Sequence, residues 1–214
     1  MKLFAHRGWA AGAEENTLAA FARAAGDTRI GGVEFDVCRA ADTGAAVVAH
    51  DPPSRAAGAL GLDDALAALA PGRLELLVEI KQAGLAQAAI DTLVAHKLAD
   101  RGTVFAFTDV ARSFPWAGAR PVRLGVIETY PWRMPRTVRE MAPDVLLLGW
   151  DERAWTRAAY RAWWGIASLD RLGRRYRLPV VAGIVRRAED LRWLERQGIY
   201  AAVADMDCIA LPSA

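Results

Sequence analysis

Ionisable side chains lie at or near the carboxyl ends of four short apolar runs of the sequence. In chain order they are His6 and Arg7, Glu34 and Asp36, His50, and Glu79 and Lys81. Acids can hold a cation, histidines can move protons, and arginine or lysine can bind an anion. These residue types would serve one reaction if the fold brings them to one place.

The acids carry the first specific prediction. Glu34 and Asp36 are two residues apart in VEFDV, so the alternation of a strand points both side chains to one face. Glu79 and Lys81 repeat that spacing in a later run. Neighbouring acids stay ionised at neutral pH only if positive charge compensates them, and hard oxygen ligands suit Mg²⁺ or Ca²⁺ better than Zn²⁺. We expect one divalent cation on Glu34, Asp36 and Glu79; the alternative is ion pairing of these acids with Arg7, Lys81 or other arginines.

The histidines add proton transfer. The chain has three, of which His6 ends the first apolar run and His50 ends the short run VVAH. Two histidines beside a cation would form a general acid and general base pair, and the alternative is a packing role. We interpret His96, in the middle of a helical pattern, as a surface or packing residue. Arg7 and Lys81 would complete a site for an anion, for which phosphate is the natural candidate.

The elements that must position these residues are read from hydrophobic periodicity. We expect strands at 3–7, 33–37, 47–50, 74–81, 104–108, 122–128, 144–150, 179–185 and 201–205, and helices at 17–26, 62–70, 84–99, 109–117, 133–142, 152–176 and 188–197. Near-continuous apolar strands that alternate with helices indicate a parallel sheet covered on both faces.

One strand does not fit the alternation. Only nine residues, 38–46, separate 33–37 from 47–50, whereas a parallel crossover needs about a dozen or more. We therefore expect an antiparallel excursion strand at 47–50. The other eight runs predict an α/β fold, a compact (β/α)₈ TIM barrel forming a single domain over 1–214, in which strand carboxyl ends carry the active site. A doubly wound open sheet is the alternative, although no G-x-G-x-x-G follows the first strand.

Composition excludes several classes of protein. Hydrophobic residues make up 53% and charged residues 24% of the 214 residues, which argues against disorder, collagen and coiled coil. No apolar run approaches the length of a membrane span, and the first residues show no signal-peptide pattern. Two cysteines form no disulfide framework, so we expect a cytoplasmic protein. A net charge of +2 gives no argument for a nucleic-acid partner.

The sequence resembles the glycerophosphodiester phosphodiesterase family in five short motifs that follow the family's order. They are AHRG at 5–8, ENTLAAF at 15–21, VEFDV at 33–37, VVAHDP at 47–52 and VEIK at 78–81. The resemblance implies a (β/α)₈ barrel and metal-dependent hydrolysis of a phosphodiester to a phosphomonoester and an alcohol. It implies His6 and His50 as the acid–base pair, Glu34, Asp36 and Glu79 as metal ligands, Arg7 and Lys81 as phosphate contacts, and Glu15 and Asn16 as lining residues.

Departures from the family pattern concern the substrate. The segment between His50 and Glu79 is short, and VADMD replaces the family's T-D-x-P after the last strand. We expect an open mouth and, from Trp9 and Trp150, apolar surface near it, which favours a phosphodiester with a bulky or lipid-like group. The alternative is that both tryptophans pack under loops. Two other functions stay open: a barrel that cleaves by cyclisation, like phospholipase-D-like toxins or phosphatidylinositol phospholipase C, and a non-catalytic barrel that binds an anion or a partner.

A segment rich in arginine and aromatic residues follows the catalytic half. Residues 151–179 place Arg153, Arg157 and Arg161 on one helical stripe, accompanied by Trp155 and several other aromatic residues. One interpretation is transient contact with an anionic membrane surface. The other is an outer barrel helix whose aromatic residues pack inward while its arginines are solvated. The sequence does not predict an oligomeric state.

Overall fold

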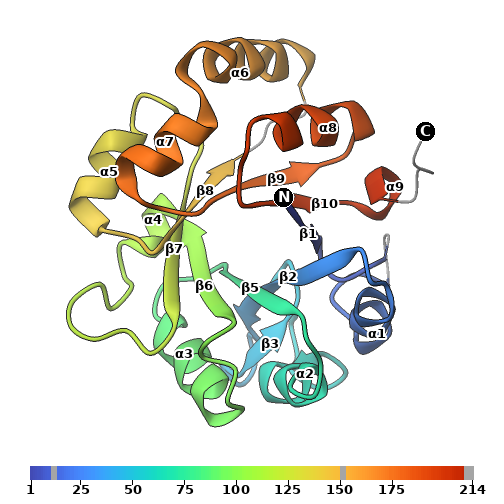
Figure 1. The fold of residues 1–214 in the computed structure, drawn as a ribbon. Coiled ribbons are helices and arrows are strands. Elements are labelled where there is room, and N and C mark those ends of the chain that lie inside the picture. The colour runs from blue at the N-terminus through green and yellow to red at the C-terminus, as the bar shows by residue number, and fades with distance from the viewer. Residues whose placement is uncertain (11–13, 150–152, 210–214) are drawn as a thin grey trace.

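Parallel strands close into a barrel, and helices form a ring around it (Figure 1). The computed structural model describes residues 1–10, 14–149 and 153–209. The strands of the barrel are β1 (Lys2–Ala5), β2 (Ile30–Arg39), β5 (Glu75–Ile80), β6 (Gly102–Phe107), β7 (Arg123–Glu128), β8 (Val145–Gly149), β9 (Val180–Val185) and β10 (Ala201–Ala204). Each pairs in parallel with its neighbour, and β1 joins both β10 and β2, which closes the ring. The predicted TIM barrel is confirmed.

Two short strands extend the sheet beyond the barrel. β3 (Ala46–Val48) pairs antiparallel with β2, with Val37 opposite Val48, and β4 (Leu60–Gly61) pairs antiparallel with β3. The strand expected at 47–50 therefore lies at 46–48, and His50 follows it in a bend. The backbone N–H of Ala49 donates to the carbonyl of Asp36, so this excursion returns the chain to the carboxyl end of β2.

The helices follow the strands in the order of a βα repeat. They are α1 (Leu18–Gly26), α2 (Leu62–Leu69), α3 (Ala86–Ala95), α4 (Thr108–Ala111), α5 (Met134–Met141), α6 (Ala154–Ala167), α7 (Leu169–Tyr176), α8 (Ala188–Arg196) and α9 (Met206–Ile209). None of the described helices combines the length and the apolar character that a membrane span requires.

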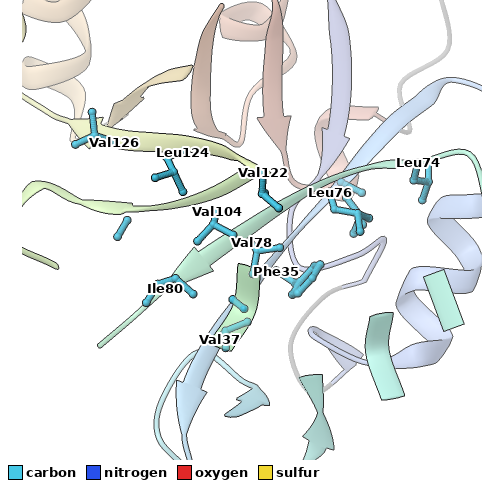
Figure 2. Packing of buried hydrophobic residues seen from close by; sticks show 14 of the residues in the cluster. Phe35, Val37, Leu74, Leu76, Val78, Ile80, Val104, Val122, Leu124 and Val126 are labelled. Carbon is cyan, nitrogen blue, oxygen red and sulfur yellow. The ribbon is translucent and has the colours of Figure 1, made fainter. Parts of the chain in front are cut away.

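Strand alternation divides the barrel into two apolar layers. Odd-numbered residues of β2 such as Phe35 face the helices, and they pack beside Val78 of β5 and Val104 of β6 (Figure 2). The barrel interior is a second cluster that includes Phe4, Leu77, Phe105, Val181 and Val203. Residues between the outward positions of β2 and β5 must therefore point into the barrel, where water is scarce and polar groups need partners.

Gly32 is the inward position of β2 at the base of the barrel. A Cβ atom there would lie 2.1 Å from Cε1 of Phe4, which fills the interior at that level. Only glycine leaves room for the phenyl ring. The base of the barrel is thus closed by an aromatic side chain, and the charged positions of β2 lie nearer its carboxyl end.

The described part of segment 151–179 folds as two helices, α6 and α7, where the sequence predicts one. Ser168 has a φ of 64°, ends α6 and caps α7 by accepting a hydrogen bond from the backbone N–H of Arg171. Arg157 and Arg161 of α6 lie 3.7 and 3.1 Å from the buried carboxylate of Asp190 on α8. Both arginines therefore point toward the protein, contrary to the interpretation that they are solvated.

The outward side of α6 is apolar. Trp155, Trp163 and Ile166 are 70%, 47% and 85% exposed. Two arginines that the membrane interpretation assigned to an anionic surface instead neutralise an internal acid. Contact of segment 151–179 with a membrane surface stays a prediction that rests on its apolar side chains.

Candidate active site

Three buried carboxylates meet inside the barrel at the carboxyl ends of two neighbouring strands. Glu34 and Asp36 come from β2 and Glu79 from β5, and Asp36 and Glu79 are partners in the parallel register. They are 3%, 1% and 8% exposed, and one oxygen of each lies within 4.8 Å of the others. We call these residues the acid triad. The two-residue spacing seen in the sequence places Glu34 and Asp36 on the inward face, as predicted.

Two cationic side chains lie against the acid triad. Nε of Arg7 is 2.8 Å from Asp36, and Nζ of Lys81 is 2.8 Å from Glu79 and 3.3 Å from Asp36. Glu34 accepts a hydrogen bond from the backbone N–H of Arg7 at 3.2 Å. No lysine or arginine side chain among the described residues pairs with Glu34. The acid triad therefore holds one more carboxylate than the two cationic side chains that pair with it.

The pKa values of the acid triad reflect this imbalance. Burial raises the pKa of Glu34 well above its ordinary range, and the charges of Asp36 and Glu79 raise it further. Burial also raises the pKa of Glu79, although Lys81 opposes the shift. Burial acts on Asp36 in the same direction, but Arg7 and its other partners outweigh it, so the pKa of Asp36 is lowered. Glu34 is thus the acid of the triad whose ionised form is least favourable in the folded protein.

The donor set fits a hard divalent cation. Three carboxylates within 4.8 Å offer oxygen ligands of the kind that Mg²⁺ and Ca²⁺ take, without the sulfur or imidazole donors that favour Zn²⁺. The excess negative charge of Glu34 is what a cation would neutralise. The ion pairs that the sequence analysis kept as an alternative are present as well, and they cover Asp36 and Glu79 but not Glu34.

The ENT motif holds the triad from the side of α1. Asn16 is buried with a φ of 58°; its amide donates to a carboxylate oxygen of Asp36 at 3.0 Å and its carbonyl oxygen accepts from the Asp36 backbone N–H at 3.3 Å. Glu15 pairs with NH1 of Arg7 at 2.8 Å. Thr17, the third residue of the motif, caps α1 by accepting from the backbone N–H of Ala20. The motif therefore fixes both an acid and a cation of the site.

A glycine allows the HRG turn to pack on α1. Gly8 has a φ of 80°, and a Cβ atom there would lie 2.7 Å from Cβ of Ala20. The turn directs Arg7 toward the acids of β2, and the backbone N–H of Asn16 donates to the Arg7 carbonyl at 2.9 Å. The backbone of AHRG is therefore tied to ENT.

His6 is buried and held by an acid that the sequence analysis did not assign to the site. Its Nδ1 lies 2.6 Å from Oδ1 of Asp205, which follows β10, while its Nε2 lies 3.9 Å from Glu34. Arg186, after β9, reaches the second oxygen of Asp205 at 3.0 Å. Burial would raise the pKa of Asp205, but His6 and Arg186 outweigh it and the pKa is lowered. The ionised Asp205 orients His6 with Nε2 toward the acid triad.

Asp205 had a signal in the sequence. It stands directly after the last strand and in the same parity as the inward residues Ala201 and Val203. In the sequence it stood out only as part of VADMD, a departure from the family pattern. Glu128 also ends a strand and is buried, but it does not point into the barrel. Its neighbour Ile127 is the inward residue, so Glu128 turns outward and accepts from Thr137 of α5 at 2.8 Å.

His50 lies on the wall of the site and not in its interior. Its side chain is 45% exposed, and its Nδ1 lies 3.1 Å from Asp51. It lines the same cavity as Arg7, Glu34, Glu79 and Lys81. The structure therefore brings all nine predicted site residues to one end of the barrel, with His6 behind the acids and His50 at the solvent side.

The cavity at this end measures about 480 Å³ and has two unlike halves. Its polar half comes from the first strands, whereas β6 to β10 contribute mostly apolar side chains. Trp9 does not line it; Trp9 packs beside α1 with Arg29 5.3 Å from its ring, and Trp150 lies outside the described residues. Among the described residues, apolar surface in the cavity comes from residues other than Trp9.

Comparisons with known proteins establish the fold of the chain. No family model matches the sequence, and no curated protein matches it. A glycerophosphodiester phosphodiesterase from Agrobacterium tumefaciens superimposes with a TM-score of 0.74 at 18% identity, covering 97% of each chain. A phosphodiesterase from Oleispira antarctica, solved with the product sn-glycerol-3-phosphate, gives 0.72 at 18% identity over 98% of this chain and 94% of that one. A calcium-dependent phosphoinositol-specific phospholipase C from a Pseudomonas species gives 0.61 at 11% identity over 100% and 91%.

Proposed function

We propose that this protein hydrolyses a phosphodiester with a divalent cation, giving a phosphomonoester and an alcohol. The observation that carries the proposal is one cavity lined by Glu34, Glu79, Arg7, Lys81 and His50, with His6 directly behind Glu34. A cation site, two anion-binding side chains and two proton carriers are the components that phosphodiester cleavage requires. The likeness to phosphodiesterase barrels, one of them holding sn-glycerol-3-phosphate, supports the same reaction class.

Arg7 and Lys81 bind the anionic phosphoryl group in this proposal. Both line the cavity while they contact the acid triad, and a guanidinium with five N–H donors or an ammonium with three keeps donors for a substrate. A divalent cation held by Glu34, Asp36 and Glu79 supplies, when bound, positive charge against the phosphoryl oxygens.

His6 and His50 move the protons. Asp205 holds Nδ1 of His6, so Nε2, which lies 3.9 Å from Glu34, is the atom that takes or gives a proton. One histidine accepts the proton of the attacking water as the new P–O bond forms, and the other protonates the departing alkoxide as the old bond breaks. The exposed His50 exchanges protons with solvent, which resets the pair. General acid–base help of this kind is worth about 10²–10⁴-fold.

The test is turnover of bis(p-nitrophenyl) phosphate and of an alkyl diester with Mg²⁺ or Ca²⁺ supplied. We expect His6→Ala and His50→Ala each to lose most of the activity on the alkyl diester while the fold and cation binding are kept. The p-nitrophenolate ion leaves without protonation, so the variant that loses less on the activated ester identifies the acid. His96→Ala is the matched control, since His96 pairs with Asp63 away from the cavity and should turn over normally.

Two results would contradict the proposal. The acid–base assignment fails if either His6→Ala or His50→Ala keeps most of its activity on the alkyl diester. Hydrolysis itself is wrong if phosphorus NMR of a diester with a neighbouring hydroxyl, such as glycerophosphocholine, detects a cyclic phosphate as the final product.

A further inference from the structure

The half of the cavity opposite the acid triad is an apolar wall. It consists of Phe105 and Phe107 of β6, Ile127 of β7, Leu147 of β8, Val181 of β9 and Val203 of β10. Because these strands follow one another around the ring, the wall is continuous from β6 to β10. A phosphodiester whose phosphoryl group lies on Arg7 and Lys81 extends one of its two ester groups toward this wall.

Polar partners are scarce beside the apolar wall. Among the described lining residues of β6 to β10 and the loops that follow them, the polar side chains are Thr129 and Arg186. The Arg186 guanidinium already donates to Asp205 at 3.0 Å. A polyol on this side would lose its hydrogen bonds to water and find few protein groups to replace them. Each hydroxyl left unpaired would cost binding free energy. An alkyl chain would lose no hydrogen bonds and would bury apolar surface.

The wall continues over the rim of the barrel. Phe107 is 45% exposed, and Phe107, Ile127 and Thr129 line both the catalytic cavity and an adjoining hollow that reaches Tyr130 and Arg133. Beyond it, Trp132 is 64% exposed and its ring centroid lies 5.1 Å from that of Tyr130. Phe107 and Ile127 therefore join the cavity to a hollow that also carries polar and charged side chains, among them Asp109 and Arg112, and that lies beside the exposed aromatic rings. Exposed apolar surface joined to a site is typical of binding grooves.

We infer that the substrate is a phosphodiester that carries an alkyl or acyl chain, and that this chain lies along the apolar wall and leaves the cavity across Phe107. The inference rests on the proposed function, because it takes the phosphoryl group to bind at Arg7 and Lys81. It makes Phe107 a residue that determines specificity.

Phosphomonoesters that resemble one product of the reaction test the chain directly. The assay measures inhibition of bis(p-nitrophenyl) phosphate turnover by glycerol 3-phosphate, propyl phosphate and hexyl phosphate, each below its micelle concentration, and calorimetry gives the same affinities without turnover. Propyl phosphate and glycerol 3-phosphate share a three-carbon skeleton, and propyl phosphate should bind more tightly. Each added methylene should lower the inhibition constant by about two- to fourfold.

A variant tests the path of the chain. Phe107→Ser should reduce the ratio between the propyl and hexyl inhibition constants toward one. Trp163→Ser is the control, because Trp163 is similarly exposed at 47% on the outer helix α6 and should leave the ratio unchanged.

The outcomes separate this inference from the proposed function. Tighter binding of glycerol 3-phosphate than of propyl phosphate, or no effect of chain length, overturns the chain inference while turnover of the reporter ester leaves the hydrolysis standing. An unchanged ratio in Phe107→Ser overturns the assigned path. If the protein does not turn over the reporter ester with cation supplied, the proposed function is contradicted. Calorimetry of the three phosphomonoesters then still shows whether the protein binds a longer alkyl chain more tightly.

Discussion

Glu34→Gln should make the cation-free protein more stable. One oxygen of each acid in the triad lies within 4.8 Å of the others, a separation at which two like unit charges repel by about 3.5 kcal/mol at an effective dielectric constant of about 20. Arg7 and Lys81 compensate Asp36 and Glu79, which leaves the charge of Glu34 in excess. Glutamine keeps the shape and can accept the hydrogen bond from the Arg7 backbone N–H.

The size of the gain is limited by proton uptake. At pH 7 a glutamate can escape repulsion by binding a proton, which costs about 3.7 kcal/mol relative to its ordinary pKa of about 4.3. After partial relaxation we expect a gain of about 1–3 kcal/mol, or a rise in Tm of about 2–12 °C for a chain of this length. Because the folded pKa of Glu34 is raised, the native state holds more protons than the unfolded state above pH 4.3, and stability falls as pH rises. The gain should therefore shrink toward pH 5.

The assay is thermal unfolding in EDTA and in saturating Mg²⁺ or Ca²⁺. A cation at 100 times its Kd stabilises the native state by about 2.7 kcal/mol, so the wild type should gain more stability than Glu34→Gln when cation is added. Glu75→Gln is the matched control, on the neighbouring strand β5. Burial would raise the pKa of Glu75, but its hydrogen bonds to Lys2 and Tyr200 outweigh burial and the pKa is lowered. The ionised Glu75 therefore stabilises the fold at a pH above the ordinary pKa of glutamate, and this stabilisation is lost as the pH falls.

Two results would refute this reasoning. Equal or lower stability of Glu34→Gln in EDTA at pH 7 would show that Glu34 carries no excess charge. An equal gain of Glu34→Gln and wild type from the cation would remove Glu34 from the ligands. Glu75→Gln should lose stability at pH 7 with and without cation, which separates the charge of the triad from a general effect of losing a glutamate.

Three further changes test the site and the barrel. Asp205→Asn should lower kcat by about 10²-fold, the lower end of what general acid–base catalysis supplies, and shift its pH profile, since the charge that orients His6 is lost; an unchanged kcat and profile would show that Asp205 has no such role. Gly32→Ala should cost about 1–3 kcal/mol in chemical denaturation because its Cβ would lie 2.1 Å from Phe4, whereas Gly26→Ala, with open space around it, should cost less; equal losses would contradict the packing. Calorimetry should show cation affinity falling as pH is lowered toward the raised pKa values in the acid triad, by up to about tenfold per pH unit for each displaced proton, and a constant affinity would refute ligation by these acids.

Strand alternation explains how much of the site the sequence predicts. Glu34, Asp36 and Glu79 stand at inward positions of strands that are otherwise apolar, and a period of two residues is enough to bring them together once the barrel closes. The same rule reaches Asp205, which follows the last strand at an inward position. It also excludes Glu128, whose neighbour Ile127 is the residue that faces inward.

Contacts between distant elements lie beyond such local rules. Arg157 and Arg161 form a helical stripe in the sequence, yet they turn toward Asp190 because α8 places a buried carboxylate beside α6. The partner of an arginine is set by the packing of two helices, and no spacing along one helix reports it. The apolar wall is equally hidden, since its members are ordinary barrel residues until the cavity next to the acid triad exposes them.

Cation-dependent cleavage of an unactivated diester tests the central claim most directly. Phosphorus NMR of dipropyl phosphate follows the loss of the diester and the growth of propyl phosphate in protein treated with EDTA and then supplied with Mg²⁺ or Ca²⁺. The acid triad, Arg7, Lys81 and the two histidines predict conversion to the monoester only when the cation is restored, and none in Glu79→Gln. A diester signal that stays constant with cation present, or equal conversion by the wild type and Glu79→Gln, would contradict the account.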